Sequence, residues 1–274
     1  MTTTRKKDTP RWGWRVWLKA GMWFSVALAA LLAARAVQAY VLDDPRFIMV
    51  GSPSEAYESA DFIVQGVSYA SRDKIIQVFA DDFGKNIFLM PISERRRHLL
   101  AIDWVEEAGV SRLWPNRIVV RITERTPVAF VRLSADPVKS KSARPAMIDR
   151  EGVIMQQPDR GNFSFPVLGG VHERQTEPER REKVARMLRL LREFGPLTKS
   201  LTVTEVDLAS RDVRLSAEVG DKEVELLLGE RSHTRRLETF LAHYPEIHKR
   251  TPEFDWFDLR LDNRIIARKS KPSE

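Results

Sequence analysis

The chain has 274 residues and no cysteine, and its 45 basic and 38 acidic side chains give a formal net charge of +7. The absence of cysteine excludes disulfide scaffolds, thiol catalysis and cysteine-based zinc sites. Six basic residues and one acidic residue lie within the first 19 residues, which leaves a charge of only +2 for the remainder. The high pI is therefore no indication of nucleic-acid binding.

An uncharged segment of fifteen residues, Ala20–Ala34, follows the basic tail. A helix from Trp12 to Tyr40 would be roughly 43 Å long, which is enough to cross a bilayer with its headgroups. Tryptophans gather at the first end of this segment and Tyr40 stands at the other, as is typical of membrane interfaces. We therefore predict a cytoplasmic tail at 1–18 and a single transmembrane helix at 19–40.

The charges on either side of this segment predict its orientation. Short flanks rich in Lys and Arg stay in the cytoplasm, whereas the twenty residues after Tyr40 offer one Arg against four acids. Residues 41–274 are therefore expected outside the cytoplasm. A cleaved signal peptide, with residues 37–39 as its cleavage site, is the alternative. The tryptophan cluster and the charge on Arg35 favour the retained anchor.

Residues 58–126 show the pattern of a small α+β domain. The expected order is a strand at 62–67, a helix after the N-cap Ser71, a second helix opened by Pro91 and Ser93, and two strands at 104–113 and 117–123 joined by a turn. Residues 87–90, between the helices, are expected to be extended. Ile118, Val120 and Ile122 alternate with other residues along the last strand and are expected to face the core.

This half of the chain resembles a POTRA domain of the kind found in the FtsQ/DivIB family of bacterial cell-division proteins. The likeness rests on the strand that leads to Gly66, on the step Asn86-Ile87-Phe88 between the helices, and on the segment "ERTPVA" after the last strand. The family usually reads Gly-Asn where this chain has Gly66-Val67. Because POTRA folds also occur in outer-membrane assembly proteins, this half indicates a fold more than a role.

Residues 127–268 are predicted to form a mostly antiparallel β domain with two helices. A loop rich in Pro, Ser and Lys at 134–146 precedes a hairpin at 147–155. One helix is expected from about Glu177 to Phe194, and a second carries Leu237, Phe240, Leu241 and Tyr244 on its apolar face. The remaining strands are expected at 165–169, 201–208, 213–219, 223–228 and 256–267, and a disordered tail at 269–274.

In their order along the chain, this hairpin and three further segments resemble the β domain that follows POTRA in FtsQ/DivIB proteins. The segments are "FPVLGG", "VELLLGE" and "WFDLRLDNRIIAR". The whole resemblance spans roughly residues 10–268. The predicted fold class is therefore α+β: one N-terminal transmembrane helix, a POTRA domain with two helices on a small mixed sheet, and a mostly antiparallel β domain with two helices.

Catalytic and metal-binding patterns are not found in the sequence. The five histidines are scattered, and His243 and His248 are on different helix faces with Pro245 between them. Glu106 and Glu107 are neighbours on a predicted strand, so they face opposite sides and cannot form an acid–base pair. Nucleophile-elbow, P-loop and dinucleotide-binding motifs do not occur. We predict no catalytic residue, no metal site and no cofactor.

The last predicted strand has two contrasting faces. One face carries Phe257, Leu259, Leu261 and Ile265, with Asn263 as its only polar member, and the other carries Asp258, Arg260, Asp262 and Arg264. As the final element of the sheet, this strand can keep a free backbone edge that accepts a partner's strand. The alternative is an ordinary terminal strand blunted by its charges.

The resemblance to FtsQ/DivIB implies that this strand binds the bitopic division proteins FtsB and FtsL. The partner-binding residues are expected to be Phe257, Leu259, Arg260, Leu261, Asp262, Asn263, Arg264 and Ile265. A secondary partner surface is expected on the POTRA domain, at Arg95, Arg96, Arg97 and Glu124. A solvated helix face is the simpler interpretation of the arginine run.

These patterns together predict a non-catalytic scaffold in the cell inner membrane, at the division septum. As the resemblance implies, it would connect the early cytoplasmic division assembly to septal cell-wall synthesis outside. Two alternatives remain open at this point. One is a POTRA protein of outer-membrane assembly or secretion, and the other is a secreted hydrolase.

Overall fold

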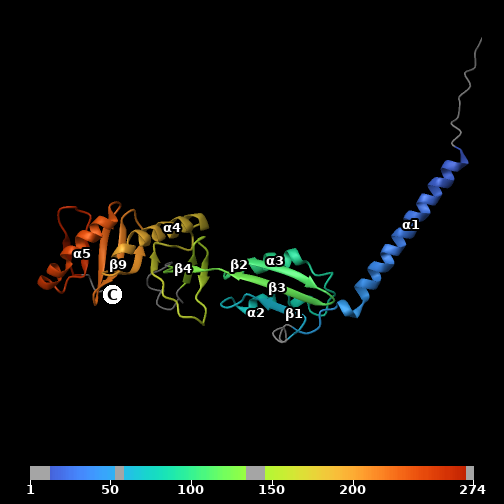
Figure 1. Cartoon of the computed structure of the whole chain (residues 1–274), viewed down its shortest axis with the longest axis horizontal. Coiled ribbons are helices and arrows are strands. Elements are labelled where there is room, and N and C mark those ends of the chain that lie inside the picture. The colour runs from blue at the N-terminus through green and yellow to red at the C-terminus, as the bar shows by residue number, and fades with distance from the viewer. Residues whose placement is uncertain (1–12, 53–58, 134–145, 270–274) are drawn as a thin grey trace, which may run out of the picture. The chain divides into compact units, whose positions relative to one another are not determined.

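The computed structural model (Figure 1) describes residues 13–52, 59–133 and 146–269. Most of the predicted tail at 1–18, the tail from 270 onward and nearly all of the loop at 134–146 lie outside the described residues. The chain divides into two compact units. Unit 1 comprises Met1–Gln65, Asp73–His98 and Gly109–Arg121, and unit 2 comprises Gly66–Arg72, Leu99–Ala108 and Ile122–Glu274.

The predicted membrane span is one helix, α1 (Trp14–Asp43). Its segment Val16–Asp43 contains an 18-residue window with a mean hydropathy of 1.7 that is not buried against the rest of the protein, so by length and composition this helix can cross a membrane. The helix ends at Asp43, and Pro45 restricts the C-cap residue Asp44 to extended backbone with ψ 119°. The Asp44 carboxylate then accepts a hydrogen bond from the backbone N–H of Arg46 at 2.9 Å.

A small sheet with two helices confirms the predicted order of strand, helix, helix, strand and strand. These elements are β1 (Phe62–Gln65), α2 (Arg72–Gln77), α3 (Ile92–Leu100), β2 (Val105–Leu113) and β3 (Arg117–Glu124). The strands lie in the order β1-β3-β2, and β1 is parallel to β3. Parallel pairing needs a crossover connection, and the segment containing the two helices supplies it.

The alternating row of β3 is buried as predicted. Ile118 and Val120 are fully buried and Ile122 is 6% exposed. Val119, on the other face of the strand, is buried as well. The strand is therefore more enclosed than its alternating pattern indicates.

The prediction of an extended segment at 87–90 is wrong. Asn86 forms an isolated bridge with Ile48, and the chain then turns. The Asn86 side chain accepts a hydrogen bond from the backbone N–H of Phe88 at 2.9 Å. A side chain that bonds its own backbone two residues on favours a turn over a strand.

A nine-stranded sheet forms the framework of unit 2, in the order β12-β11-β10-β9-β8-β7-β4-β5-β6. Its strands are β4 (Pro127–Val131), β5 (Ala146–Asp149), β6 (Ile154–Gln156), β7 (Val167–Gly169), β8 (Thr202–Asp207), β9 (Val213–Val219), β10 (Lys222–Gly229), β11 (Trp256–Asp258) and β12 (Ile266–Arg268). Five of the eight neighbouring pairs are antiparallel, as a mostly antiparallel sheet requires, and three are parallel.

Two helices bury their apolar faces in the core of this sheet: α4 (Glu177–Glu193) and α5 (His233–Arg250). The buried residues of α5 are Leu237, Phe240 and Tyr244, spaced three and four apart as one helix face requires. α4 begins at a capping box, in which the carboxylate of Glu179 accepts a hydrogen bond from the backbone N–H of Thr176 at 2.7 Å. Both helices follow the sequence prediction closely.

The prediction of one continuous strand at 256–267 is wrong. β11 and β12 are two short strands joined by residues 259–265, and they pair with each other in antiparallel fashion. As a result the predicted faces do not hold. Leu261 is exposed, whereas Asp258 is buried. The physical reason is that Asp258 forms a local turn with Arg260, described below.

Candidate partner-binding surface

The hairpin β11–β12 forms one end of the nine-stranded sheet. The strand with an unpaired backbone edge therefore differs from the one that the sequence predicted. β11 is paired on both sides, in parallel with β10 and in antiparallel fashion with β12. Among the described residues, β12 has no strand on its other side. The open edge is therefore Ile266–Arg268 and not the whole strand predicted at 256–267.

The hairpin is anchored to α5 through an aromatic cluster. Phe257 lies 5.0 Å from Phe240 and 6.1 Å from Tyr244, measured between ring centroids. On the other face the guanidinium of Arg268 stacks 3.6 Å above the ring of Trp256, its cross-strand neighbour. One face of the hairpin is thus held in the core, and the other is covered by a cation–π contact.

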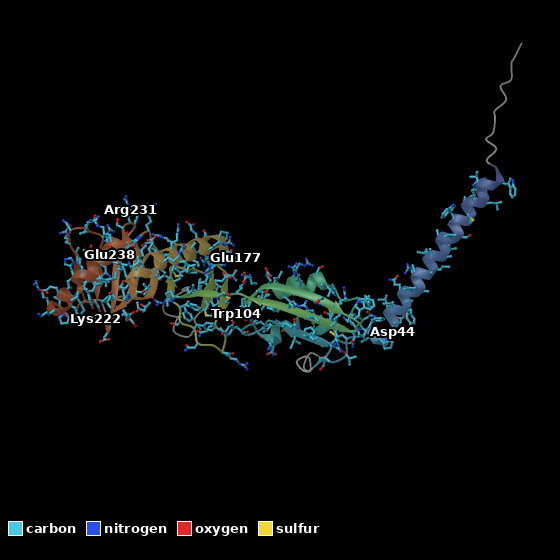
Figure 2. The ribbon with its side chains drawn as sticks, in the orientation of Figure 1. Asp44, Trp104, Glu177, Lys222, Arg231 and Glu238 are labelled. Carbon is cyan, nitrogen blue, oxygen red and sulfur yellow. The ribbon has the colours of Figure 1, made fainter. Side chains whose placement is uncertain are left out.

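The segment before β11 is held by Lys222 of β10, labelled in Figure 2. Its ammonium group donates hydrogen bonds to the backbone carbonyls of Pro252 and Phe254, the latter at 3.0 Å. At the other end of β11, the backbone N–H of Leu259 donates to the carbonyl of Leu227 at 2.9 Å. The entry and exit of this short strand are therefore both fixed to β10.

The turn after β11 is stabilised by a buried carboxylate. Asp258 is 6% exposed and accepts hydrogen bonds from the backbone N–H and the guanidinium of Arg260, at 3.0 Å and 2.8 Å. These hydrogen bonds lower the pKa of Asp258, because they favour its charged form. Arg260 also donates to Asp212 at 3.1 Å. Since Asp258 bonds forward along the chain, the strand stops here.

Arg236 of α5 connects the helix to this turn. Its guanidinium is mostly buried and donates to the carbonyls of Leu228 and Arg260 at 2.6 Å and 2.8 Å. It also pairs with the exposed carboxylate of Asp262 at 3.3 Å. A side chain at Gly229 would come within 2.8 Å of this guanidinium, so the glycine keeps room for the contact.

A cleft of about 390 Å³ lies between α5 and the loop 259–265. Six of the predicted partner-binding residues line it: Leu259, Leu261, Asp262, Asn263, Arg264 and Ile265. The other two do not, because Phe257 is in the core and Arg260 is held by its acidic partners. The structure thus brings most of the predicted residues together, in a loop and not on a strand.

The other wall of the cleft was missed by the sequence analysis. It consists of residues on one face of α5: Arg235, Arg236, Thr239, His243, Glu246 and Ile247. Their spacing of three and four residues indicates a polar helix face, but nothing local shows that residues more than ten positions further along the chain complete the cleft. Its cationic side chains outnumber its carboxylates, which favours an acidic partner.

Two of the four residues of the predicted secondary surface, Arg95 and Glu124, have partners inside the chain. Arg95 is mostly buried and pairs with Asp82 at 2.6 Å, which raises the pKa of its guanidinium. Glu124 accepts hydrogen bonds from three successive backbone N–H groups, those of Ser68, Tyr69 and Ala70, at 2.9, 2.8 and 2.6 Å. Both side chains therefore have structural partners within the chain. Arg96 and Arg97 are exposed on α3.

No group of three or more His, Asp or Glu side chains that could hold a metal ion is found within the described parts of the chain. The half-buried imidazole of His233 forms a hydrogen bond with the carbonyl of Gly229 at 3.1 Å, and its partial burial lowers its pKa. This histidine is a helix-terminal packing residue.

Comparisons with known proteins address both halves of the chain. An FtsQ-type POTRA domain model matches residues 59–125. A second model, described as Cell division protein FtsQ/DivIB, C-terminal, matches residues 138–260. The chain belongs to the FtsQ/DivIB family. The family assignment favours a cell-division protein over the outer-membrane and hydrolase alternatives.

Relatives with the name Cell division protein FtsQ support this assignment. The one from Koribacter versatilis (strain Ellin345) is 34% identical over 215 residues, covering 76% of this chain and 60% of the relative. The chain thus spans less than two thirds of that relative's length. The relative from Syntrophotalea carbinolica is 24% identical over 93% of this chain and 87% of its own length. The FtsQ/DivIB C-terminal model ends at residue 260, before β12.

Proposed function

We propose that this FtsQ/DivIB protein is a non-catalytic division scaffold that binds other membrane division proteins at the open edge of β12. The observation that carries the proposal is the edge itself. β12 ends the sheet without a further strand among the described residues, on a hairpin fixed by Phe257 and Arg236. A rigid edge of this kind can take up a partner's strand through backbone hydrogen bonds.

The partners are bitopic division proteins of the FtsB and FtsL type, as the family resemblance implies. The cleft beside the edge adds selectivity, because Arg235 on α5 and Arg264 in the loop 259–265 favour acidic side chains. Through such contacts the protein would connect the early cytoplasmic division assembly to septal cell-wall synthesis. We place it in the inner membrane at the septum, with its N-terminus in the cytoplasm and residues 41–274 outside.

The experiment that tests this proposal places proline in β12. Successive residues of a strand direct their N–H groups to opposite sides, so one of Ile266→Pro and Ala267→Pro removes an outward donor and spares the ladder with β11. We expect that variant to lose partner capture in cells, measured by photo-crosslinking from position 268. The matched controls are Ile266→Ala and Ala267→Ser, which keep the backbone N–H. We expect both to keep partner capture.

Two results would contradict the proposal. One is that both proline variants keep normal crosslinking to the small bitopic proteins while circular dichroism shows a folded domain. The other is that crosslinks arise only from probes at Arg96 and Arg97 on α3. The second result would move the partner site to the POTRA domain.

A further inference from the structure

Three aromatic rings from separate segments of unit 1 meet close to the end of α1. Phe47 lies 5.3 Å from Phe88 and 5.5 Å from Trp114, and the rings of Phe88 and Trp114 are 4.9 Å apart, all between centroids. Despite these contacts, 63% of Trp114 is exposed. The cluster is therefore not a closed core.

Apolar side chains next to this cluster are also exposed. Outside α1, the three most exposed large apolar residues of the described chain are Val50, Leu89 and Trp114, each above 60%. Val50 is three residues after Phe47, and Leu89 follows Phe88. We call Phe47, Val50, Phe88, Leu89 and Trp114 the apolar tip. Exposed apolar side chains gathered in this way on a folded unit indicate an interaction site.

The tip has a fixed conformation. The guanidinium of Arg112 donates hydrogen bonds to the carbonyls of Ile87 and Met90, both at 2.6 Å, and so braces the turn that carries Leu89. The backbone N–H of Ile87 donates to the carbonyl of Phe47 at 2.9 Å. These contacts hold the apolar side chains outward without help from a partner.

The tip is also tied to the end of the membrane span. The amide of Asn86 donates hydrogen bonds to the carbonyls of Val41 and Leu42, the last turn of α1, at 2.9 Å and 3.0 Å. Phe47 follows the final helical residue, Asp43, by only four positions. A helix of 28 residues is about 42 Å long, close to the thickness of a bilayer with its headgroups, so Asp43 lies at headgroup level.

We propose that the apolar tip lies in the headgroup–acyl boundary of the bilayer that α1 crosses. Tryptophan favours this boundary because its ring is apolar and its N–H is polar. The exposed cations Arg46, Lys85 and Arg117 each lie within three positions of a tip residue in the sequence. Such cations can pair with lipid phosphates. Asp44, labelled in Figure 2, pairs with Arg46 at the same level. The tip thus keeps this end of the unit against the membrane surface.

A single-site label tests the proposal in the full chain, which has no native cysteine. Leu89→Cys carries an environment-sensitive fluorophore, and the protein is placed in vesicles of phosphatidylethanolamine and phosphatidylglycerol. The matched control is Glu107→Cys, an exposed position six residues before the end of β2 and hence roughly 20 Å along the strand. A label at Ala29 in α1 reports that the helix is inserted.

We expect a blue-shifted emission at position 89 that lipids with brominated acyl chains quench, as they quench the label at position 29. The label at position 107 should show neither effect. Water-like emission at position 89 beside a quenched label at 29 would overturn the proposal. So would a blue shift without lipid quenching, because it would mean that a second copy covers the tip. An unquenched label at position 29 would show that α1 is not inserted in the bilayer, which would also contradict the proposed position of the tip.

A second variant, measured in the same vesicles, tests whether Trp114 itself contributes to the lipid contact. Trp114→Ala removes the largest ring of the tip while Phe47 and Phe88 remain. We expect it to weaken the quenching at position 89 and to leave the unfolding transition almost unchanged, since Trp114 is largely exposed. Unchanged quenching in this variant would contradict a role for Trp114 in membrane contact.

Discussion

At the scale of single residues, this structure depends on side chains that satisfy backbone groups. Glu124 accepts hydrogen bonds from three successive N–H groups, and Asn86 donates to two carbonyls at the end of α1. Arg112 donates to carbonyls of a turn, and Arg236 donates to one carbonyl of β10 and one of the turn after β11. Each of these residues could be mistaken for a free surface group in the sequence. Their charges and amides form hydrogen bonds inside the chain.

Two glycines with similar φ angles, Gly66 and Gly84, allow a test of how closely the backbone packs around them. Gly66 has φ +81° and Gly84 has φ +76°. A Cβ at Gly66 would come within 2.1 Å of the carbonyl oxygen of Ile122, whereas Gly84 has open space. We expect Gly84→Ala to cost roughly 1–2 kcal/mol for the left-handed backbone alone. Gly66→Ala should cost clearly more, as measured by urea unfolding. Equal losses would contradict the close approach at Gly66.

At the scale of elements, hydrophobic periodicity decides which segments are regular, and polar side chains decide where they end. The helices α4 and α5 follow from apolar residues spaced three and four apart. The strand β11 stops at Asp258 because that carboxylate bonds Arg260 and not a neighbouring strand. Apolar and charged residues therefore alternate from 256 to 267 in the sequence, but this segment does not form one strand.

The middle of β3 supplies a prediction at this scale. Val120 is fully buried, and Val120→Asp places a charge there without a partner. We expect it to destabilise the POTRA fold by roughly 3–5 kcal/mol in denaturant unfolding. Thr123→Asp makes the same acidic replacement at an exposed position of the same strand and is the control. If the two variants unfold alike, Val120 is not in a closed core.

At the scale of the whole molecule, the chain combines one candidate membrane helix with two domains of the FtsQ/DivIB family. The basic residues before α1 and the acidic residues after it predict the direction of insertion. The proposed partner-binding edge at β12 needs the folded part to lie outside the cytoplasm.

Topology can be measured with reporter fusions in cells. Fusions after about residue 60 should be active only as extracytoplasmic reporters, and added protease should leave residues 1–40 in the membrane. The physical reason is the net charge of +5 on the first 19 residues, which is retained on the cytoplasmic side. A soluble species cut near Ala39 would contradict the anchor and support a signal peptide.

The sequence by itself determined the candidate membrane helix, the order of elements in the POTRA fold, both helices of the β domain and the family. These features depend on periodicity, charge asymmetry and turn residues, all of which are local in the chain. The buried row of β3 and the end of α4 near Gly195 belong to this class.

Only the tertiary structure decided where the backbone edge is free and which charges are available. The cleft joins α5 to a loop that begins more than twenty residues after Arg235, and the apolar tip joins Phe47, Phe88 and Trp114. Contacts between residues so far apart leave no periodic signal, because each segment alone satisfies a different local pattern. The end of a strand depends likewise on whether Asp258 finds Arg260 and Asp212 in the folded chain.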